Sequence, residues 1–376
     1  MQIGILKEPG FENRVSALPE VVAQLVKLKV EIKVETGAGE KASAADATYE
    51  AVGAKIATRA DVLSTSNILL GIHNLADGEL ASLKHGAVLL GVYQPLFNPD
   101  VMGRYATAGF TVFSLDMLPR TTRAQAMDVL SSQANIAGYK AVVLAASVYP
   151  HYFPMLTTAA GSIPPAKVLI LGAGVAGLQA IATARRLGAV VEVFDTRPAA
   201  KEEVMSLGAK FVEVEGAADA SKAGGYAVMQ TEEYQQRQKA RIAQAIAKAD
   251  VVITTAQIPG KKAPVLVTTE MVMAMKPGSV IIDLAAATGG NCELTENNAS
   301  VVKHGVTIIG NSNLAGTVPV DASKMYGKNA YNFLKLIIDE HGALNLNFED
   351  DLVLGSCITN NGQIIHERLK GLAASN

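Results

Sequence analysis

The clearest chemical signal is a set of three glycines in the stretch KVLILGAGVAGLQAIATARRLGAVVEVFD, residues 167–195. Gly172, Gly174 and Gly177 form the pattern G-x-G-x-x-G, directly after an apolar run and at the start of a helical pattern. The first glycine permits a tight turn, and the second lets a pyrophosphate approach the backbone at the positive end of a helix. The third allows helix and strand to pack closely. The stretch therefore predicts a dinucleotide-binding site.

An acidic residue beyond the motif indicates which dinucleotide is bound. Asp195 lies 18 residues after Gly177, at the end of the next expected strand, where its carboxylate can bind a ribose diol. A carboxylate at that place repels a 2′-phosphate, so the sequence favours NAD(H) over NADP(H). Arg197 keeps the other cofactor open, because an arginine at this position can accommodate a 2′-phosphate.

A second group of polar residues interrupts an otherwise apolar helical pattern, PRTTRAQAMDVLSSQANIAGYKAV, residues 119–142. Steps of three and four place four of them on one helical face: Gln125, Asp128, Ser132 and Asn135. Ser131 lies one turn beyond Asp128, and Arg120 precedes the helix. The stripe is either a ligand-facing surface or a solvated face on which Thr122 and Gln125 form a capping box.

Two loops after expected strands are further candidates. The segments TTAQIPGKKAPVLVT and DLAAATGGNCELT both follow apolar runs of the second half of the chain. Loops at the carboxyl ends of parallel strands line the ligand crevice of an open α/β sheet. We therefore expect Gln257, Ala286, Gly289 and Gly290 either to border the nicotinamide end of the ligand or to belong to ordinary connecting loops.

The elements that must position these residues alternate along the chain. Short apolar runs such as VEIKVE, NILLGI, AVLLGVY and VVITT are separated by helical patterns, which indicates parallel sheets covered on both faces. The expected fold is α/β, with two doubly wound Rossmann-like domains whose sheets are mainly parallel. The first domain comprises residues 1–136 plus 320–376, and the NAD(H)-binding domain comprises residues 137–319. Residues 215–240 interrupt the second series, partly as a mobile surface segment.

Composition excludes several classes of function. The chain has 376 residues, of which 49% are hydrophobic and 18% charged, so it can fill two cores. Its net charge of -2 and the lack of a dense Lys/Arg block argue against nucleic-acid binding. The start resembles no secretory signal, and no apolar run reaches membrane-spanning length. Scattered histidines and two cysteines, Cys292 and Cys357, disfavour a metal site and are typical of buried thiols in a reducing cytoplasm.

Taken together, these motifs resemble the NAD(H)-binding domain I of proton-translocating NAD(P) transhydrogenases, within the alanine dehydrogenase/transhydrogenase superfamily. The resemblance covers essentially the whole chain, from GILKEPGFENRVSALP to NLAGTVPVDASKMYGKN. The segment RAQAMDVLSSQANIAGYKAV is the discriminating one, because the first and last segments are shared with alanine dehydrogenases. The implied activity is direct hydride transfer between NAD(H) here and NADP(H) on a partner domain.

The resemblance assigns roles to individual positions. The residues that match nicotinamide contacts of the family are Arg120, Gln125, Asp128 and Ser131. The residues that match pyrophosphate and adenosine contacts are Gly172, Gly174, Val175, Ala176, Gly177, Asp195, Thr196 and Arg197. Gly225 and Tyr226 match the core of a mobile loop, and Gln238 and Gln257 match positions near the bound nucleotide.

The alternatives are a soluble NAD-dependent amino-acid dehydrogenase of the alanine type and a non-catalytic NAD-sensing module. Alanine dehydrogenases use a Lys and a His where this chain has LLGIHN and GVYQPLFNP, and only the carboxylate-binding Arg14 is retained. The missing base favours transhydrogenase. The resemblance further implies a homodimer that joins membrane-spanning and NADP(H)-binding subunits or domains. It would lie at the cytoplasmic side of the inner membrane and be held there by these partners.

Overall fold

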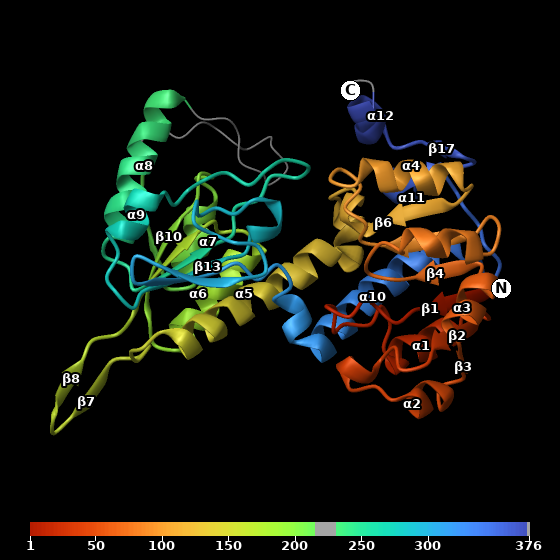
Figure 1. Cartoon of the computed structure of the whole chain (residues 1–376), viewed down its shortest axis with the longest axis horizontal. Helices are drawn as coiled ribbons and strands as arrows, with labels where there is room; N and C mark the ends of the chain where they lie inside the picture. The colour runs from red at the N-terminus through yellow and green to blue at the C-terminus, as the bar shows by residue number, and fades with distance from the viewer. Residues whose placement is uncertain (215–230, 374–376) are drawn as a thin grey trace. The chain divides into compact units, whose positions relative to one another are not determined.

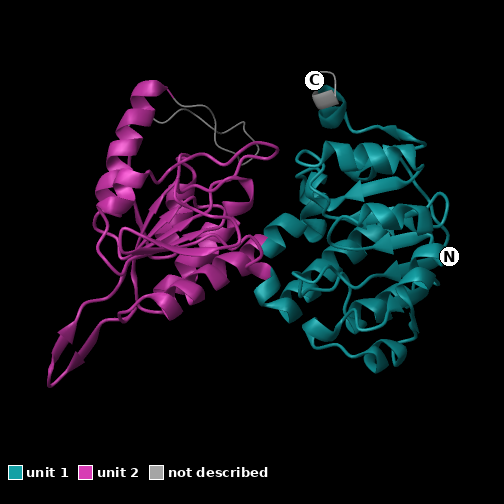
Figure 2. Cartoon of the chain, in the orientation of Figure 1, with its two compact units in different colours: residues 1–133, 316–376 teal, residues 134–315 magenta. Residues whose placement is uncertain are grey.

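The computed structural model describes residues 1–214 and 231–373. The chain divides into two compact units, residues 1–133 with 316–376 and residues 134–315 (Figure 2). Each unit is a mainly parallel sheet with helices on both faces, so the expected α/β fold of two doubly wound Rossmann-like units is confirmed. No helix in the described part of the chain is long and apolar enough to cross a membrane.

The first unit is built on one sheet, with described strands in the order β17-β16-β6-β5-β4-β1-β2-β3. Their bounds are β1 Gln2–Ile5, β2 Glu31–Glu35, β3 Lys55–Ala57, β4 Ile68–Leu70, β5 Val88–Gly91, β6 Thr111–Ser114, β16 Cys357–Asn360 and β17 Gln363–Ile364. The strands β1 to β6 pair in parallel, and β16 pairs antiparallel with β6 and β17. Because β1 lies between β2 and β4, the strand order reverses there, which opens a crevice at the carboxyl ends of the strands.

Two hydrophobic clusters cover the two faces of this sheet. The helices of the unit are α1 Pro19–Val26, α2 Asp46–Glu50, α3 Arg59–Thr65, α4 Pro99–Thr107, α10 Pro319–Ile337, α11 Asp351–Ser356 and α12 Glu367–Ala373 (Figure 1). Its short 3-10 helices are η1 Glu40–Ala42, η2 Asp77–Ser82, η3 Leu115–Met117 and η4 Thr122–Met127. One cluster packs α1 and α10 against the sheet, and the other packs α3 and α4. Burial on both faces explains why the strands are continuously apolar.

The second unit has its described strands in the order β11-β10-β9-β12-β13-β15-β14, all parallel except β14. Their bounds are β9 Lys167–Leu171, β10 Val190–Phe194, β11 Lys210–Phe211, β12 Val251–Thr254, β13 Val280–Asp283, β14 Ser300–Lys303 and β15 Val306–Ile309. The helices are α5 Val129–Val148, whose first turn lies in the other unit, α6 Val175–Arg186, α7 Ala200–Ser206, α8 Glu232–Ile246 and α9 Thr269–Met273. The 3-10 helices η5 Ala286–Thr288 and η6 Ala315–Thr317 complete the unit. The crevice of this sheet lies between β9 and β12.

A hairpin of β7 Leu156–Thr158 and β8 Gly161–Ile163 projects from the second unit as a separate two-stranded sheet (Figure 1). All six strand residues are exposed. The sequence did not predict this hairpin, because its strands are too short to show a periodic pattern.

Two expectations about secondary structure were wrong. The helix expected to begin at Thr122 is the 3-10 helix η4, and a new helix, α5, begins only at Val129. Asp128 separates them with a ψ of 89°, and its side chain accepts a hydrogen bond from the backbone N–H of Ser131. The polar part of the expected surface segment is also helical, since residues 232–240 belong to α8, whose N-cap Thr231 accepts from the N–H of Tyr234.

Candidate functional site

The glycine motif forms the turn between β9 and α6. Gly172 has a φ of +108°, in the left-handed region, and a side chain there would meet Thr255 Oγ1 at 2.4 Å. A Cβ on Gly177 would lie 1.9 Å from the carbonyl oxygen of Gly172, so this position requires direct contact between helix and turn. Gly174 is the N-cap of α6, and a Cβ there would meet nothing within 4 Å. The backbone therefore leaves open the place where a pyrophosphate would approach a helix N-terminus.

Asp195 follows β10 directly and is the hub of a small charged network. Its carboxylate accepts from the N–H of Ala173 at 2.7 Å, which joins it to the glycine turn. It also accepts from the N–H of Arg197 at 2.8 Å and from the guanidinium of Arg197 at 2.9 Å through both oxygens. The hydrogen bond to Asp195 raises the pKa of Arg197. Asp195 thus lies at the expected place, with its charge partly balanced by the residue that was its rival for ribose recognition.

Two buried polar side chains hold the loops across the crevice. The carboxylate of Asp283 at the end of β13 is fully buried and accepts from the N–H groups of Ala285, Asn291 and Cys292. The hydroxyls of Thr254 and Thr295 complete its coordination. Asn291 in turn bonds the backbone N–H and C=O of Ala256 and the C=O of Pro264. The loops after β12 and β13 are therefore fixed to each other.

The loop residues expected at the nicotinamide end lie in this fixed region. Gln257 is exposed and donates to the carbonyl of Leu284 at 3.0 Å, while Ala286 begins η5. Gly289 and Gly290 have φ values of +102° and +79°, so both positions favour glycine for the turn itself. Their conformations account for the two glycines without a ligand.

The polar segment of residues 120–135 does not form one helical stripe, because Gln125 lies in η4 and Asp128 lies between the helices. Asp128 caps α5, and the hydroxyl of Ser131 donates to its Oδ2 at 2.6 Å. The expected capping box of Thr122 and Gln125 is absent from η4, whose N-cap, Thr121, makes no side-chain hydrogen bond. Gln125 is exposed, and so is Arg120 just before the helix.

Amide groups of α10 fix the position of this segment within the first unit. Asn329 donates to the carbonyl of Ala126 at 2.9 Å and accepts from Ser132 Oγ at 2.7 Å. Asn332 donates to the same carbonyl at 3.1 Å. The buried Ala124 and Met127 pack into the core beneath it. The η4 turn is therefore a fixed support on which the exposed side chains of Arg120 and Gln125 stand.

Arg14 is engaged by neighbouring side chains of the first unit. Its guanidinium bonds the buried carboxylate of Glu12 at 2.9 and 2.7 Å and the amide oxygen of Gln133 at 2.8 Å. His73 contacts the same carboxylate through Nε2 at 2.8 Å. Burial alone would raise the pKa of Glu12, but the hydrogen bonds from Arg14 and His73 hold it below its ordinary value. Gln94 follows β5 at the place expected for a catalytic His.

The remaining expected residues are only partly placed. Val175 is exposed and Ala176 is half-buried in the first turn of α6, and Thr196 and Gln238 are half-buried. Gly225 and Tyr226 lie outside the described residues.

Sequence reasoning missed Asn291, Asp283, Thr255 and Gly138. A Cβ on Gly138 would lie 2.1 Å from the carbonyl oxygen of Ala176, so α5 and α6 touch there. Asp283 carried a readable signal, because it follows a buried strand in the same way as Asp195.

Known proteins share this architecture. The family model for the N-terminal domain of alanine dehydrogenase/PNT matches residues 4–137, and the model for the C-terminal domain matches residues 141–367. The chain is 48% identical to the first of the separate polypeptides that make up the NAD(P) transhydrogenase alpha subunit of Rhodospirillum rubrum, over 100% of both chains. It matches the crystal structure of transhydrogenase from Sinorhizobium meliloti with a TM-score of 0.89 and 46% identity, over 97% of this chain and 100% of that one. Alanine dehydrogenase of Bacillus subtilis is 28% identical over 98% of this chain and 93% of its own length.

Proposed function

The chain belongs to the alanine dehydrogenase/PNT family, and we propose that it is the NAD(H)-binding component of a proton-translocating nicotinamide nucleotide transhydrogenase. Hydride passes directly between NAD(H) on this chain and NADP(H) on a partner domain or subunit. The observation that carries the proposal is the open backbone over Gly174 beside the carboxylate of Asp195 in the second unit.

The residues of the second unit fit the adenosine and pyrophosphate parts of the dinucleotide. The N–H groups at the start of α6 and the helix dipole would hold the pyrophosphate over Gly174. Asp195 would bind the ribose diol, with the glycine turn and Arg197 fixing its orientation. Val175, Ala176, Thr196, Gln238 and Gln257 would complete the binding surface, and the segment of Gly225 and Tyr226 would close over it.

The polar segment of the first unit would orient the nicotinamide. When bound, the nicotinamide supplies the hydride, so the protein has to place the ring and exclude water. Arg120 and Gln125 stand exposed on η4 and would contact polar groups of the ring. Asp128 and Ser131 bond each other at the start of α5, so their remaining hydrogen-bonding capacity would reach the ligand from a fixed position.

The arrangement around Arg14 supports hydride transfer rather than amino-acid oxidation. An amino-acid dehydrogenase needs a cation for the substrate carboxylate and a base for its nitrogen. Here the guanidinium of Arg14 already bonds Glu12 and Gln133, and no lysine follows β4. Direct transfer between two nicotinamide rings needs neither group.

We further propose a homodimer in which the β7–β8 hairpin contacts a second copy of the chain. A hairpin on its own is only marginally stable in water, and this one exposes apolar side chains. Met155 at its base is 68% exposed, and Tyr152 is 55% exposed. Met155→Lys should give monomers in sedimentation equilibrium, whereas Met273→Lys, at a 60% exposed methionine of α9, should leave the dimer intact. A monomeric wild type would refute the proposal.

The partners are membrane-spanning and NADP(H)-binding subunits or domains, which would hold the chain at the cytoplasmic side of the inner membrane. A reconstitution tests the function. Mixed with a separately prepared NADP(H)-binding domain, the chain should oxidise NADH at the expense of NADP⁺. With pyruvate and ammonia in place of that domain, it should not turn over. Turnover with pyruvate and ammonia alone would favour the alanine-type dehydrogenase, and turnover with neither would favour a sensing module.

A further inference from the structure

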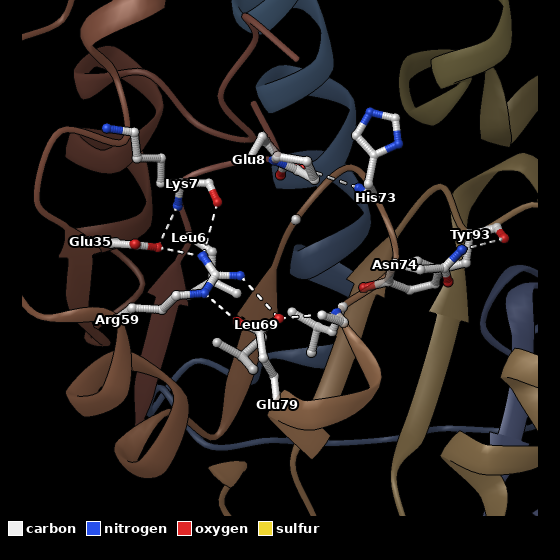
Figure 3. A pocket seen from close by; sticks show the side chains of 14 residues that line it. Leu6, Lys7, Glu8, Glu35, Arg59, Leu69, His73, Asn74, Glu79 and Tyr93 are labelled. Atoms are coloured by element: carbon white, nitrogen blue, oxygen red, sulfur yellow. Dashed lines mark hydrogen bonds and ion pairs between the residues drawn. The ribbon is translucent and has the colours of Figure 1, made fainter. Parts of the chain in front are cut away.

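The first unit contains a pocket of about 460 Å³ at the carboxyl ends of β1 and β4, where its strand order reverses. We call it the β1–β4 pocket (Figure 3). Its lining residues are Leu6, Lys7, Glu8, Pro9, Glu35, Arg59, Leu69, Gly71, His73, Asn74, Leu75, Ala76, Glu79 and Tyr93. All belong to the first unit, so this pocket is separate from the glycine turn of the second unit. The reversal point of an open parallel sheet is a usual place for ligands, and the volume is in the ordinary range for small molecules.

The one guanidinium in the lining, that of Arg59, is already neutralised. It bonds Glu35 at 2.7 Å and both carboxylate oxygens of Glu79, and it donates to the carbonyl of Lys7 at 3.0 Å (Figure 3). These bonds fix the side of the pocket where α3 begins. Lys7 is 45% exposed at its side chain, and its ammonium lies 3.8 Å from Glu40. Neither cation is therefore well placed to recognise an anionic ligand.

Hydrogen-bond acceptors line the other part of the pocket. Glu8 accepts from the backbone N–H of Ile72 at 2.7 Å and from that of His73 at 3.2 Å. Burial raises the pKa of Glu8 to about 7. The imidazole of His73 points its Nε2 to Glu12 rather than to Glu8. Glu8 is thus a desolvated carboxyl group whose hydrogen bonds come from neutral backbone groups.

Asn74 adds an acceptor that is not satisfied by the protein. Its amide nitrogen donates to the carbonyl of Tyr93 at 3.3 Å, but its buried Oδ1 accepts no hydrogen bond from the described residues. A buried acceptor without a partner is uncommon in proteins and destabilising. Apolar walls from Leu6, Leu69 and Leu75 complete the pocket.

We propose that the β1–β4 pocket binds a small organic amine in its protonated form, with its ammonium group on Glu8 and a further N–H donor reaching Asn74 Oδ1. The apolar walls hold the carbon body of the ligand. Three carboxylates against two paired cations make the lining unfavourable for phosphate or carboxylate ligands. This inference does not rest on the proposed hydride transfer, because it concerns another unit and another ligand.

Three probes of similar size that share a phenyl group test the charge requirement: 2-phenylethylamine, 2-phenylethanol and 3-phenylpropanoate. They are titrated into the full chain at pH 8, where Glu8 is ionised, and binding is followed by the amide NMR signals of Ile72 and His73. The amine should bind at least about tenfold more tightly than the alcohol, because a charge-assisted hydrogen bond replaces a neutral one. The carboxylate should not bind. Equal binding of amine and alcohol, or preference for the carboxylate, would overturn the proposal.

Variants locate the site. Glu8→Gln keeps the shape and the acceptor for Ile72 but removes the charge, so amine affinity should fall about tenfold to that of the alcohol. Glu50→Gln, the same change at an exposed position of α2, should leave it unaltered. Should Glu8→Gln not fold, as judged by lost NADH binding, Asn74→Ala is used instead and should weaken amine binding several-fold. Amine affinity unchanged by the variant that folds would refute the assignment.

Discussion

Gln125→Ala separates a ligand contact from a structural role more cleanly than any other change in the polar segment. Gln125 is exposed in η4, and the structure gives its side chain no capping hydrogen bond. Its removal should therefore change the free energy of unfolding by no more than about 0.5 kcal/mol. If Gln125 orients the nicotinamide, the ring would sample more positions, and a misplacement of about 1 Å can lower the rate about 100-fold.

Asp128→Ala is the matched comparison, because this residue has a structural role that can be estimated. Its carboxylate caps α5 through the N–H of Ser131 at 2.9 Å. Loss of an N-cap costs about 1 kcal/mol of stability, which should appear as a lower melting temperature. We expect Asp128→Ala to lower both the melting temperature and the rate, and Gln125→Ala to lower the rate alone.

The assay is stopped-flow hydride transfer from bound NADH to bound NADP⁺ in the reconstituted system, beside NADH dissociation constants and melting curves for each variant. Dissociation constants should remain near those of the wild type, since most binding energy is expected from the pyrophosphate and adenosine ends. A normal transfer rate for Gln125→Ala would refute the reasoning and reduce the segment to a well-supported turn on α10.

Three further predictions concern charged groups. Asp195→Ala should weaken NADH binding by about 10- to 100-fold, as expected for a lost charge-assisted hydrogen bond, and should weaken NADPH binding less; calorimetric titration with both nucleotides checks this, and an unchanged preference would contradict it. Asp283→Ala should cost about 3 kcal/mol or more in denaturant unfolding, because its donors would be left buried without an acceptor; a loss below about 1 kcal/mol would contradict that role. The pKa of Glu8 is raised in the fold to about 7 from its ordinary value of 4.5, so unfolding releases a proton between these pH values and stability falls as pH rises through them. The fall, on the order of 3 kcal/mol, should be absent from Glu8→Gln, and this difference between the two proteins isolates Glu8 from His73, Glu12, Tyr93 and Tyr326 around it; parallel pH profiles would exclude it.

The fold was readable from the sequence where burial dictates residue type. Strands such as β12 and β13 are apolar on both faces because helices cover both sides of the sheet, and the glycine turn was readable because each glycine answers a separate steric demand. Short edge strands such as β3 and β14, and the β7–β8 hairpin, escaped because their exposed residues carry no apolar pattern.

The site was predicted less completely because much of it depends on contacts distant in the chain. The break at Asp128 follows from a side-chain cap that competes with helix continuation, and periodicity alone cannot reveal it. The link between Asn291 and Ala256 joins two loops 35 residues apart. The ion pair of Arg197 with Asp195 is local, but the sequence offered the two residues as rivals and gave no reason to expect a pair.

Transfer of an isotopic label tests the central claim most directly. NADH carrying deuterium at both C4 positions is mixed with NADP⁺, this chain and a separately prepared NADP(H)-binding domain, and the NADPH formed is analysed by mass spectrometry. Direct hydride transfer predicts one deuterium in every NADPH molecule and none in the solvent. NADPH without deuterium would contradict the account, because the hydrogen would then have passed through an exchangeable group of the protein.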